Sequence, residues 1–317
     1  MKKLFGLVLG TMMSLSVFTG CGTQDDRITV GLVQLVEHTS LDMIRESLVA
    51  ELEARGYDDS KVKIDYQNAQ GDQSNLNSIC KKFVGDQVDT IVAIATPSAQ
   101  AAVAATTDIP IIFSAVTDPV AANLVSDLNK PSGNITGTSD AIPVDQVFEL
   151  CNELTPEVKK IGFLYTASEV NSQSVIEQAK KFAPEYGFTF EEMTITNTSE
   201  LQQAAYSLAG KVDAIYTPID NNIASAMTLL SEVGKESKIP VYVGADSMVM
   251  DGAYATVGIN YEELGKQTAD MVIQVLEGTP ISEMPVETLN NFEKVINKTT
   301  ANKIGAPDHV EGAIIVE

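Results

Sequence analysis

A repeating alternation of short apolar strands and amphipathic helices constrains the fold of this chain more than any other feature. Residues 90–95 (TIVAIA) and 110–115 (PIIFSA) are strand-like runs without a polar alternate face. Between such runs lie segments with apolar residues at helical spacing, as in residues 40–55, where Ser40 is the expected N-cap. Buried strands separated by helices are typical of parallel sheets covered by helices on both faces. The sequence therefore predicts an α/β protein.

The pattern runs through the chain as two successive units of the same kind. Residues 133–143 (GNITGTSDAIP) carry turn-forming residues between the units and are the expected first crossover. A second Pro- and Gly-rich break follows at residues 278–285. About 290 residues remain after the N-terminal segment, which is more than one apolar core comfortably serves. Two similar lobes are therefore expected rather than one large sheet.

The first twenty residues have the composition of an export signal. Two lysines precede an apolar run of about fifteen residues, shorter than the roughly 20 residues that span a bilayer. The following Cys21 resembles the lipidated cysteine of a bacterial lipobox, although Phe18 departs from the usual Leu. The prediction is a lipoprotein signal peptide at residues 1–20, lipidation of Cys21 and a tether at residues 21–26. An ordinary secretory signal with an incidental cysteine is the alternative.

Charge and cysteine content limit the classes of partner. Asp and Glu number 43 against 21 Lys and Arg, so the surface repels phosphates. Nucleic acid and acidic membranes are therefore poor candidates for partners. Cys80 and Cys151 lie in segments with helical patterning, and sequence alone leaves open whether they pair. Two buried thiols are the preferred interpretation.

Patterns of catalytic residues are missing from the sequence. The only histidines are His38 and His309, which excludes His-rich metal sites, although His38 could act singly. The sequence contains no Gly-x-Ser-x-Gly elbow, no phosphate-binding loop with Gly-Lys-Ser/Thr and no Gly-x-Gly-x-x-Gly fingerprint. We therefore expect a protein that is not an enzyme, with no catalytic residues, no metal and no cofactor.

The residues that follow each predicted strand are the candidates for ligand binding, because ligands of parallel α/β sheets bind beyond the carboxyl ends of strands. Helix starts at Thr96-Pro97 and Thr217-Pro218 offer free N–H groups and a positive dipole end to a carboxylate. Plain N-capping is the alternative. The candidates are Glu37, Thr96, Ser98, Ala99, Thr117, Asp118, Asp140, Asn171, Thr217, Asp220, Asn221 and Asp246.

Four of these candidates are aspartates, whereas the other carboxylates of the chain lie mostly on helix faces. A cationic ligand group would need one or two of them as desolvated partners, and the sequence does not assign which. A carboxylate held by helix N-termini and an ammonium held by aspartate together predict a zwitterionic amino acid as the ligand.

Six segments together carry a resemblance to a known family: 36–38 (VEH), 64–72 (IDYQNAQGD), 94–97 (IATP), 115–119 (AVTDP), 210–216 (GKVDAIY) and 258–265 (GINYEELG). The family that they resemble is the substrate-binding lipoproteins of ABC importers for aromatic amino acids. The resemblance covers nearly all of the mature chain. It implies a type I periplasmic-binding-protein fold, with two Rossmann-like lobes of parallel sheet joined by a three-segment hinge. Lobe 1 would comprise residues 27–139 plus about 256–282, and lobe 2 residues 140–255 plus about 283–317.

The resemblance also implies what the protein does. We expect a monomeric receptor, lipid-anchored outside the cytoplasm, that closes around tryptophan, tyrosine or phenylalanine and delivers it to ABC permease subunits. A receptor for another small solute such as a branched-chain amino acid, and a sensory or adhesin lipoprotein, are the alternatives. The implied ligand contacts are Thr96, Ser98, Thr117, Asp220, Asn221 and Asp246, with Phe113, Val116, Tyr165 and Tyr261 as candidates for an apolar wall.

Overall fold

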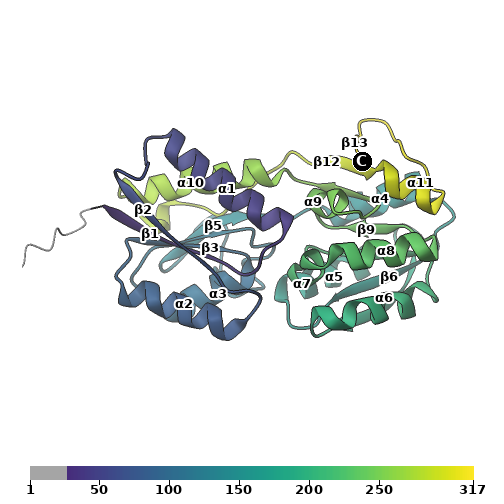
Figure 1. Cartoon of the computed structure of the whole chain (residues 1–317), viewed down its shortest axis with the longest axis horizontal. Helices are drawn as coiled ribbons and strands as arrows, with labels where there is room; N and C mark the ends of the chain where they lie inside the picture. The colour runs from purple at the N-terminus through teal and green to yellow at the C-terminus, as the bar shows by residue number, and fades with distance from the viewer. Residues whose placement is uncertain (1–26) are drawn as a thin grey trace, which may run out of the picture.

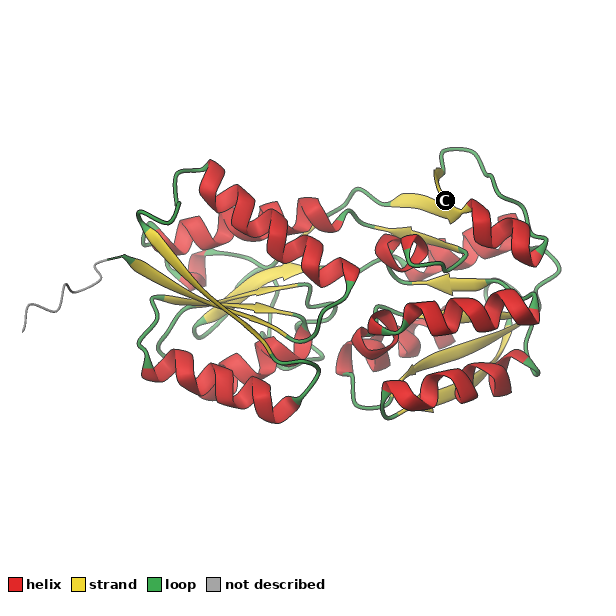
Figure 2. Cartoon of the chain, in the orientation of Figure 1, coloured by secondary structure: helices red, strands yellow, loops and turns green. Residues whose placement is uncertain are grey.

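The computed structural model describes residues 27–317, and these form two α/β lobes side by side (Figure 1). The predicted signal peptide at residues 1–20, the lipidation of Cys21 and the tether at residues 21–26 lie outside the described residues. Each lobe has a central sheet with helices on both faces, as Figure 2 shows. The predicted α/β fold with two lobes is confirmed.

The sheet of lobe 1 is entirely parallel, as the near-continuous apolar strands predict. Helices α1 (Thr39–Ala54) and α10 (Tyr261–Leu276) pack together on one face, and α2 (Gln73–Gly85) and α3 (Thr96–Ala105) cover the other (Figure 1). In spatial order the strands are β11 (Glu287–Thr288), β5 (Ile135–Ser139), β4 (Ile111–Ser114), β3 (Thr90–Ile94), β1 (Ile28–Gln34) and β2 (Val62–Asn68).

The sheet of lobe 2 is parallel except for one antiparallel pair, β10 with β12. In spatial order its strands are β13 (Ile314–Val316), β12 (Glu293–Asn297), β10 (Ala255–Gly258), β9 (Val241–Val243), β8 (Ala214–Thr217), β6 (Lys160–Thr166) and β7 (Thr189–Ile195). Its helices are α4 (Val144–Leu154), α5 (Val170–Phe182), α6 (Leu201–Ala209), α7 (Asn221–Ser225), α8 (Met227–Ser237), α9 (Asp246–Met250) and α11 (Lys298–Ile304). The short 3-10 helices are η1 (Thr198–Glu200) and η2 (Ile281–Glu283).

The chain passes between the lobes three times, at residues 140–143, 259–260 and 289–292. The expected boundaries need correction at two of these places. Thr256 lies in β10, which pairs with β9 and β12 in lobe 2, so lobe 1 resumes only at α10. The tail beyond residue 283 first adds β11 to the sheet of lobe 1 and then enters lobe 2 with β12. The 133–143 segment, expected to be a crossover of turns, contains β5.

Some local predictions are wrong in detail. Ser40 is not the N-cap of α1, because the helix begins at Thr39 and His38 is its N-cap. Residues 223–233 have the apolar spacing of a single helix, but they lie in two helices, α7 and α8, that meet at Ala226. Sequence analysis did not identify α9 or β13, since both are only a few residues long.

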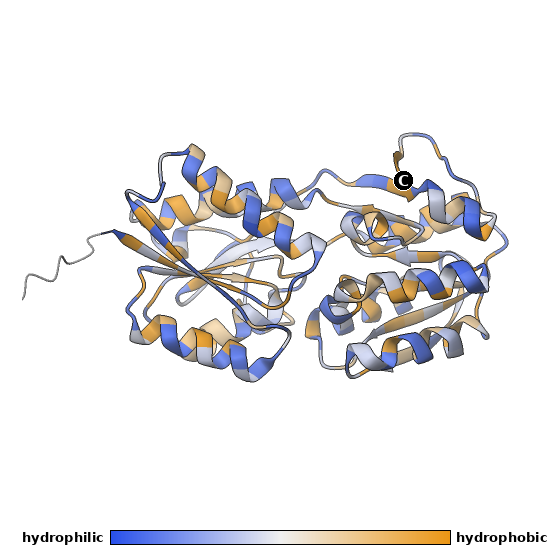
Figure 3. Ribbon diagram, in the orientation of Figure 1, coloured by the Kyte–Doolittle hydropathy of each residue, from blue (hydrophilic) through white to orange (hydrophobic). Residues whose placement is uncertain are grey.

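Apolar side chains fill the interior of both lobes. The strands are largely hydrophobic, and the helices carry both hydrophobic and hydrophilic residues (Figure 3). Cys80 in α2 and Cys151 in α4 are both buried and unpaired, which confirms the interpretation as two buried thiols. Burial raises the pKa of each thiol to about 11, so both remain protonated at neutral pH. No helix within residues 27–317 is long and apolar enough to cross a membrane.

Candidate functional site

The carboxyl ends of the strands face the other lobe, except in β12 and β13, which run in the opposite direction. Hydrogen bonds join the lobes at these strand ends. His38 Nε2 lies 3.4 Å from Asn221 Oδ1, and Thr39 Oγ1 donates to the Asp251 carboxylate at 2.8 and 3.0 Å. The hydroxyls of Ser40 and Ser247 also bond to each other, although Ser40 was expected to be a cap. These contacts place the N-terminus of α1 against α7 and α9, so the lobes are closed on one another.

Two hollows lie between the lobes, one on each side of the contact. The smaller, about 200 Å³, is lined by His38 and Thr39 of lobe 1 and by residues of α7 and α8. The larger, about 520 Å³, is lined by Asp118 and Ala121 of lobe 1 and by α5. Asp118 is half-buried, accepts a bond from Ala121 N at 2.9 Å and is also bonded by Ser174 Oγ of α5. Asp118 therefore links the lobes at the rim.

The N-terminus of α3 is a helix start in lobe 1 whose N–H groups have no side-chain cap. Its N-cap is Ala95, whose side chain cannot cap, and Pro97 follows at the second helical position. Thr96, Ser98 and Ala99 are buried in the first turn. The hydroxyl of Ser98 is buried without a hydrogen-bond partner among the described residues. An uncapped helix start with a hydroxyl beside it suits an anion.

The turn before α3 holds an unusual backbone. Ala95 has φ +81° and Ala115, the residue after the neighbouring strand β4, has φ +54°. Residues other than glycine rarely occupy this region, and it costs of order 1 kcal/mol or more at each position. The amide of Ala95 donates to Ser114 O at 2.9 Å, which helps to hold both turns in place. Such conformations concentrate at ligand-binding sites.

Helix α7 of lobe 2 differs, because the protein's own carboxylates occupy its N-terminus. Asp220 accepts bonds from Thr166 N at 2.7 Å, Thr166 Oγ1 at 2.8 Å, Ser172 Oγ at 2.8 Å and Ile223 N at 3.0 Å. The expectation of a helix start at Thr217-Pro218 is wrong. The helix begins later, at Asn221, and its positive end is already neutralised.

Glu169 is the second of these carboxylates, and sequence analysis missed it. Its Oε2 accepts from Asn221 N at 3.0 Å, Asn221 Nδ2 at 2.7 Å and Asn171 Nδ2 at 3.0 Å. Its Oε1 accepts from Asn222 N at 3.0 Å and Asn222 Nδ2 at 3.1 Å. Burial and the adjacent Asp220 raise the pKa of Glu169, and the N–H donors of Asn221 and Asn171 oppose the rise. The sequence could have pointed to Glu169, because it follows β6 and stands two residues before the candidate Asn171.

A second acidic cluster lies where the chain crosses between the lobes. Asp140 accepts from Thr117 Oγ1 at 2.8 Å and from Tyr261 OH at 3.2 Å, and burial raises its pKa to about 6. Asp246 accepts from Ser247 N at 2.7 Å, the single hydrogen bond to its carboxylate within the described chain. Burial, and secondarily the carboxylate of Glu293, raise its pKa to about 6. Asp246 therefore has the most acceptor capacity left.

The remaining candidates differ in how deeply they are buried and in the partners that they have. Glu37 is exposed and is not brought together with the others. Thr217 Oγ1 and Asn171 Oδ1 are buried and have no partner in the part of the chain that the structure describes. Tyr165, a candidate for an apolar wall, donates to Glu192 Oε2 at 3.1 Å within the sheet of lobe 2. The buried strand-end residues, together called the interlobe site, are Thr96, Ser98, Thr117, Asp140, Asn171, Thr217 and Asp246.

The interlobe site combines hydrogen-bond donors of lobe 1 with the carboxylates of Asp140 and Asp246. Lobe 1 offers hydroxyls and the N–H groups of α3, which suit an anion, while Asp140 and Asp246 suit a cation. Residues 27–317 contain no group of three His, Cys, Asp or Glu side chains placed to hold a metal ion. A zwitterion matches this distribution of donors and acceptors.

Two α/β lobes that meet at their strand ends, with buried polar groups between them, define a two-lobed ligand-binding protein. The sequence profile of the family described as ABC transporter substrate binding protein matches residues 29–310. The chain belongs to this family, and it has the type I periplasmic-binding-protein fold expected from the sequence.

Individual relatives extend the comparison. The chain is 43% identical to the tyrosine-binding protein of Clostridioides difficile (strain R20291), over 94% of this chain and 91% of the relative. It is 41% identical to an ABC domain from Streptococcus pneumonia solved in complex with L-Trp, with a TM-score of 0.89. That match covers 92% of this chain and 100% of the other.

A ligand-free, open relative gives a useful contrast. A substrate-binding protein with adhesive properties from Clostridium difficile is 43% identical, with 92% of this chain and 99% of that one covered, but its TM-score is 0.71. The two solved structures are equally similar in sequence, so the lower score reflects a different arrangement of the lobes. The lobes of this chain are therefore arranged as in the complex with L-Trp.

Proposed function

We propose that this chain is an extracytoplasmic receptor that captures an amino acid between its lobes and delivers it to an ABC importer. The observation that carries the proposal is the set of buried polar atoms without partners at the strand ends of both lobes: Ser98 Oγ, Asn171 Oδ1 and Thr217 Oγ1 among residues 27–317. A buried, unpaired polar group costs about 1–3 kcal/mol, so a ligand that supplies the partners recovers that free energy.

The two charged groups of the ligand, both attached to its α-carbon, are assigned to different residues of the interlobe site. The carboxylate binds at the N-terminus of α3, next to Ser98, where the helix dipole favours negative charge. The ammonium binds at Asp246, whose carboxylate keeps free acceptor capacity, with Asp140 nearby. Asp220 is not the ammonium partner, because four donors within the protein already use its carboxylate.

An aromatic amino acid is the proposed ligand, and the names of the relatives support it: one binds tyrosine and another was solved with L-Trp. Lipidation of Cys21, attachment at the outer face of the membrane, a monomeric state and transfer to permease subunits complete the proposal. No chemical turnover of the ligand is expected.

Calorimetric titration with each amino acid tests this function. Stoichiometric binding of one or more aromatic amino acids, with a thermal shift that grows with ligand concentration, is the expected result. No binding of any amino acid would overturn it. A mutant strain that lacks the protein should lose uptake of the labelled ligand, whereas a purely sensory or adhesive protein would leave uptake intact.

Ser98→Ala tests the assignment of the carboxylate. Loss of a hydrogen bond to a charged group should weaken binding about tenfold or more. Ser78→Ala in α2 is the matched control, because that exposed hydroxyl bonds only to Ser74 O, one turn back in its own helix. Equal affinities of the two variants would contradict the assignment.

A further inference from the structure

His38 is a buried histidine between the lobes that the proposed contacts leave unused. It follows β1 and occupies the N-cap position of α1, and only 8% of its surface is exposed. Its ring reaches across to lobe 2, where Nε2 lies 3.4 Å from Asn221 Oδ1. The other ring nitrogen, Nδ1, is buried without a hydrogen-bond partner among the described residues.

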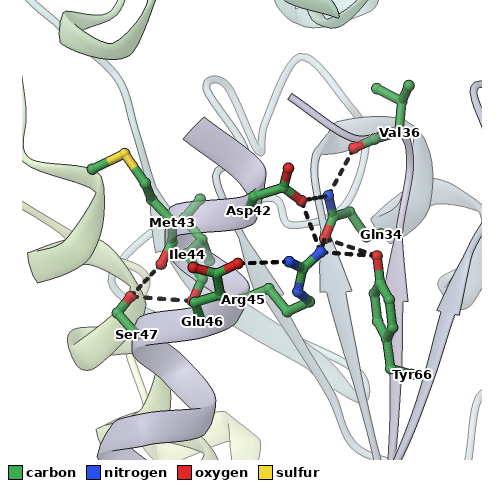
Figure 4. Close-up of polar contacts among 9 residues, drawn as sticks. All are labelled: Gln34, Val36, Asp42, Met43, Ile44, Arg45, Glu46, Ser47 and Tyr66. Atoms are coloured by element: carbon green, nitrogen blue, oxygen red, sulfur yellow. Dashed lines mark hydrogen bonds and ion pairs between the residues drawn. The ribbon is translucent and has the colours of Figure 1, made fainter. Parts of the chain in front are cut away.

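The segment that carries His38 is held in place by a network at the end of β1 (Figure 4). Gln34 Nε2 donates to Val36 O and to Asp42 Oδ1, each at 2.8 Å. Arg45 donates to Asp42 Oδ1 at 2.7 Å and to Tyr66 OH at 3.0 Å. The network ties the β1–α1 turn to the first turns of α1 and to β2. His38 is thus presented from a fixed backbone, as a selective contact requires.

Neighbouring hydrogen bonds fix which ring nitrogen carries the proton. Asn221 donates through Nδ2 to Glu169 Oε2 at 2.7 Å, so its Oδ1 faces His38 as an acceptor. The nitrogen next to Oδ1 must then be the donor, which places the proton of the neutral ring on Nε2. Burial lowers the pKa of His38 to about 4, against smaller opposing effects of Asn221 and Asp42, so the ring is neutral at pH 7. Nδ1 is therefore a bare acceptor.

The turn that carries His38 runs beside the proposed carboxylate site. Gln34 at the end of β1 pairs with Ile94 at the end of β3, so the segments leading to His38 and to α3 leave the sheet side by side. Adjacent strands are about 4.8 Å apart, which is less than the length of an aromatic amino acid. A ligand held by its carboxylate at α3 can therefore bring its side chain to His38.

We infer that His38 Nδ1 accepts a hydrogen bond from the side chain of the bound ligand, and that the site thereby selects aromatic amino acids with a phenol O–H or indole N–H over phenylalanine. The inference rests on the proposed function and names the residue that sets its selectivity. Phenylalanine would leave Nδ1 buried and unpaired, while tyrosine and tryptophan each supply a donor. The cost of such an unpaired group corresponds to a preference of roughly tenfold to a hundredfold. Glu169 and Asn221 are positioning residues, because their hydrogen bonds determine which ring nitrogen of His38 carries the proton.

Calorimetric titration of the full mature chain with L-tyrosine, L-tryptophan and L-phenylalanine is the first test. The wild type should bind tyrosine and tryptophan roughly tenfold to a hundredfold more tightly than phenylalanine. His38→Leu should remove most of this preference, because no acceptor remains. His38→Asn should restore part of it, since a short amide oxygen can reach the place of Nδ1. Asn171→Ala is the matched comparison, because Asn171 Oδ1 is another buried acceptor without a partner among residues 27–317.

Nitrogen-15 NMR of the wild type gives a test that needs no change at His38. The sequence has only two histidines, and a His309→Gln variant assigns their signals. The phenylalanine complex, in which the lobes are closed and Nδ1 receives no donor, should show an unprotonated Nδ1 and a protonated Nε2 for His38. Tyrosine should shift the Nδ1 signal upfield toward a hydrogen-bonded value, and phenylalanine should not.

The outcomes separate the inference from the function on which it rests. Failure of every aromatic amino acid to bind would overturn both. Equal binding of tyrosine and phenylalanine by the wild type would overturn the inference and leave amino acid capture standing. So would an equal loss of affinity for all three ligands in His38→Leu, a protonated Nδ1 in the phenylalanine complex, or loss of selectivity in Asn171→Ala with none in His38→Leu.

Discussion

At the scale of single residues, the number of hydrogen bonds that each buried carboxylate accepts separates structural from binding roles. Asp220 accepts four bonds from within lobe 2, whereas Asp246 accepts one from the adjacent Ser247. Both follow strands and both looked alike in the sequence. Removal of an acceptor leaves its buried donors unpaired, so the two aspartates should respond differently to substitution.

Asp220→Ala should lower the free energy of unfolding by about 3 kcal/mol, because the donors of Thr166, Ser172 and Ile223 lose their acceptor. Urea denaturation measures the change. Asp246→Ala is the control and should change stability by less than about 1 kcal/mol while it weakens ligand binding. A stable Asp220→Ala variant with wild-type unfolding would show that this network contributes little.

Binding of the ligand should weaken at acidic pH because of Asp246. Its pKa in the ligand-free protein is raised to about 6, and a ligand ammonium nearby favours the ionised form and lowers that pKa. Binding therefore releases a proton below pH 6, and affinity should fall by up to about tenfold per pH unit there while it stays constant above about pH 7. Because the pKa of Asp246 is higher in the folded protein than in the unfolded chain, its ionised carboxylate lowers the free energy of unfolding above pH 6. This destabilisation becomes smaller as the pH falls below 6.

Titration calorimetry from pH 5 to pH 8 tests this pH dependence. Asp246→Asn should bind more weakly at neutral pH and with a flatter pH profile. An unchanged profile in that variant would assign the titration to Asp140, whose pKa is also raised to about 6.

The residue scale also shows where prediction from sequence ends. Position after a strand was enough to find Ser98, Asn171 and Asp246, because parallel strands deliver their following residues to one edge. It could not tell which of Asp220 and Asp246 keeps free acceptor capacity for a ligand, because Asp220 is occupied by donors from other segments, Thr166 and Ser172. Roles that depend on partners distant in the chain are not visible in a local pattern.

At the scale of elements, periodicity identified the long helices and buried strands, and composition misled where a strand contains turn residues. β5 was hidden in a segment with Gly133 and Gly137. A Cβ at Gly137 would lie 2.0 Å from Phe113 O, so the glycine permits β5 to pair closely with β4 rather than marking a turn. The physical reason for that glycine is a tertiary contact, which the sequence does not display.

Helices α1 and α10 depend on a second glycine for their close packing. A Cβ at Gly265 would lie 2.0 Å from Ser47 Oγ and 2.6 Å from Ile44 O, and a backbone atom cannot move aside cheaply. Gly265→Ala should therefore lower the free energy of unfolding by about 1–3 kcal/mol, measured by urea denaturation.

Gly85→Ala is the matched control at the end of α2. A Cβ there meets nothing within 4 Å, so the higher helix propensity of alanine should raise stability by up to about 1 kcal/mol. Equal effects of the two substitutions would contradict the packing argument.

At the scale of the whole molecule, the order of the elements along the chain does not reveal which lobe each joins. β10 and β12 belong to lobe 2, and β11 between them belongs to lobe 1. Strand pairing over such separations is decided by tertiary contacts, so the crossings were predicted only near their true places. The crossings matter because they form the hinge about which the lobes open and close.

The bond between Thr39 and Asp251 should stabilise the closed arrangement without touching the ligand. The Asp251 carboxylate from lobe 2 lies at the N-terminus of α1 in lobe 1, and His38 offers that helix no side-chain cap. An anion at a helix N-terminus contributes about 0.3–1 kcal/mol and up to about 2 kcal/mol when partly buried. Since opening breaks this contact, Asp251→Ala should raise the ligand's dissociation constant about threefold to tenfold.

Titration calorimetry measures the weaker binding by Asp251→Ala. Small-angle scattering of this variant without ligand should show a larger radius of gyration than that of the ligand-free wild type. Thr39→Val, which removes the donor at nearly constant volume, should have a similar effect. Asp270→Ala is the control for charge, because Asp270 bonds Arg55 within lobe 1 at 2.6 Å and does not cross between the lobes. If Asp251→Ala and Asp270→Ala bind the ligand equally well, the closed arrangement is set by the ligand and not by this contact. A loss confined to Asp251 and Thr39 would instead place part of the binding free energy outside the ligand's own contacts.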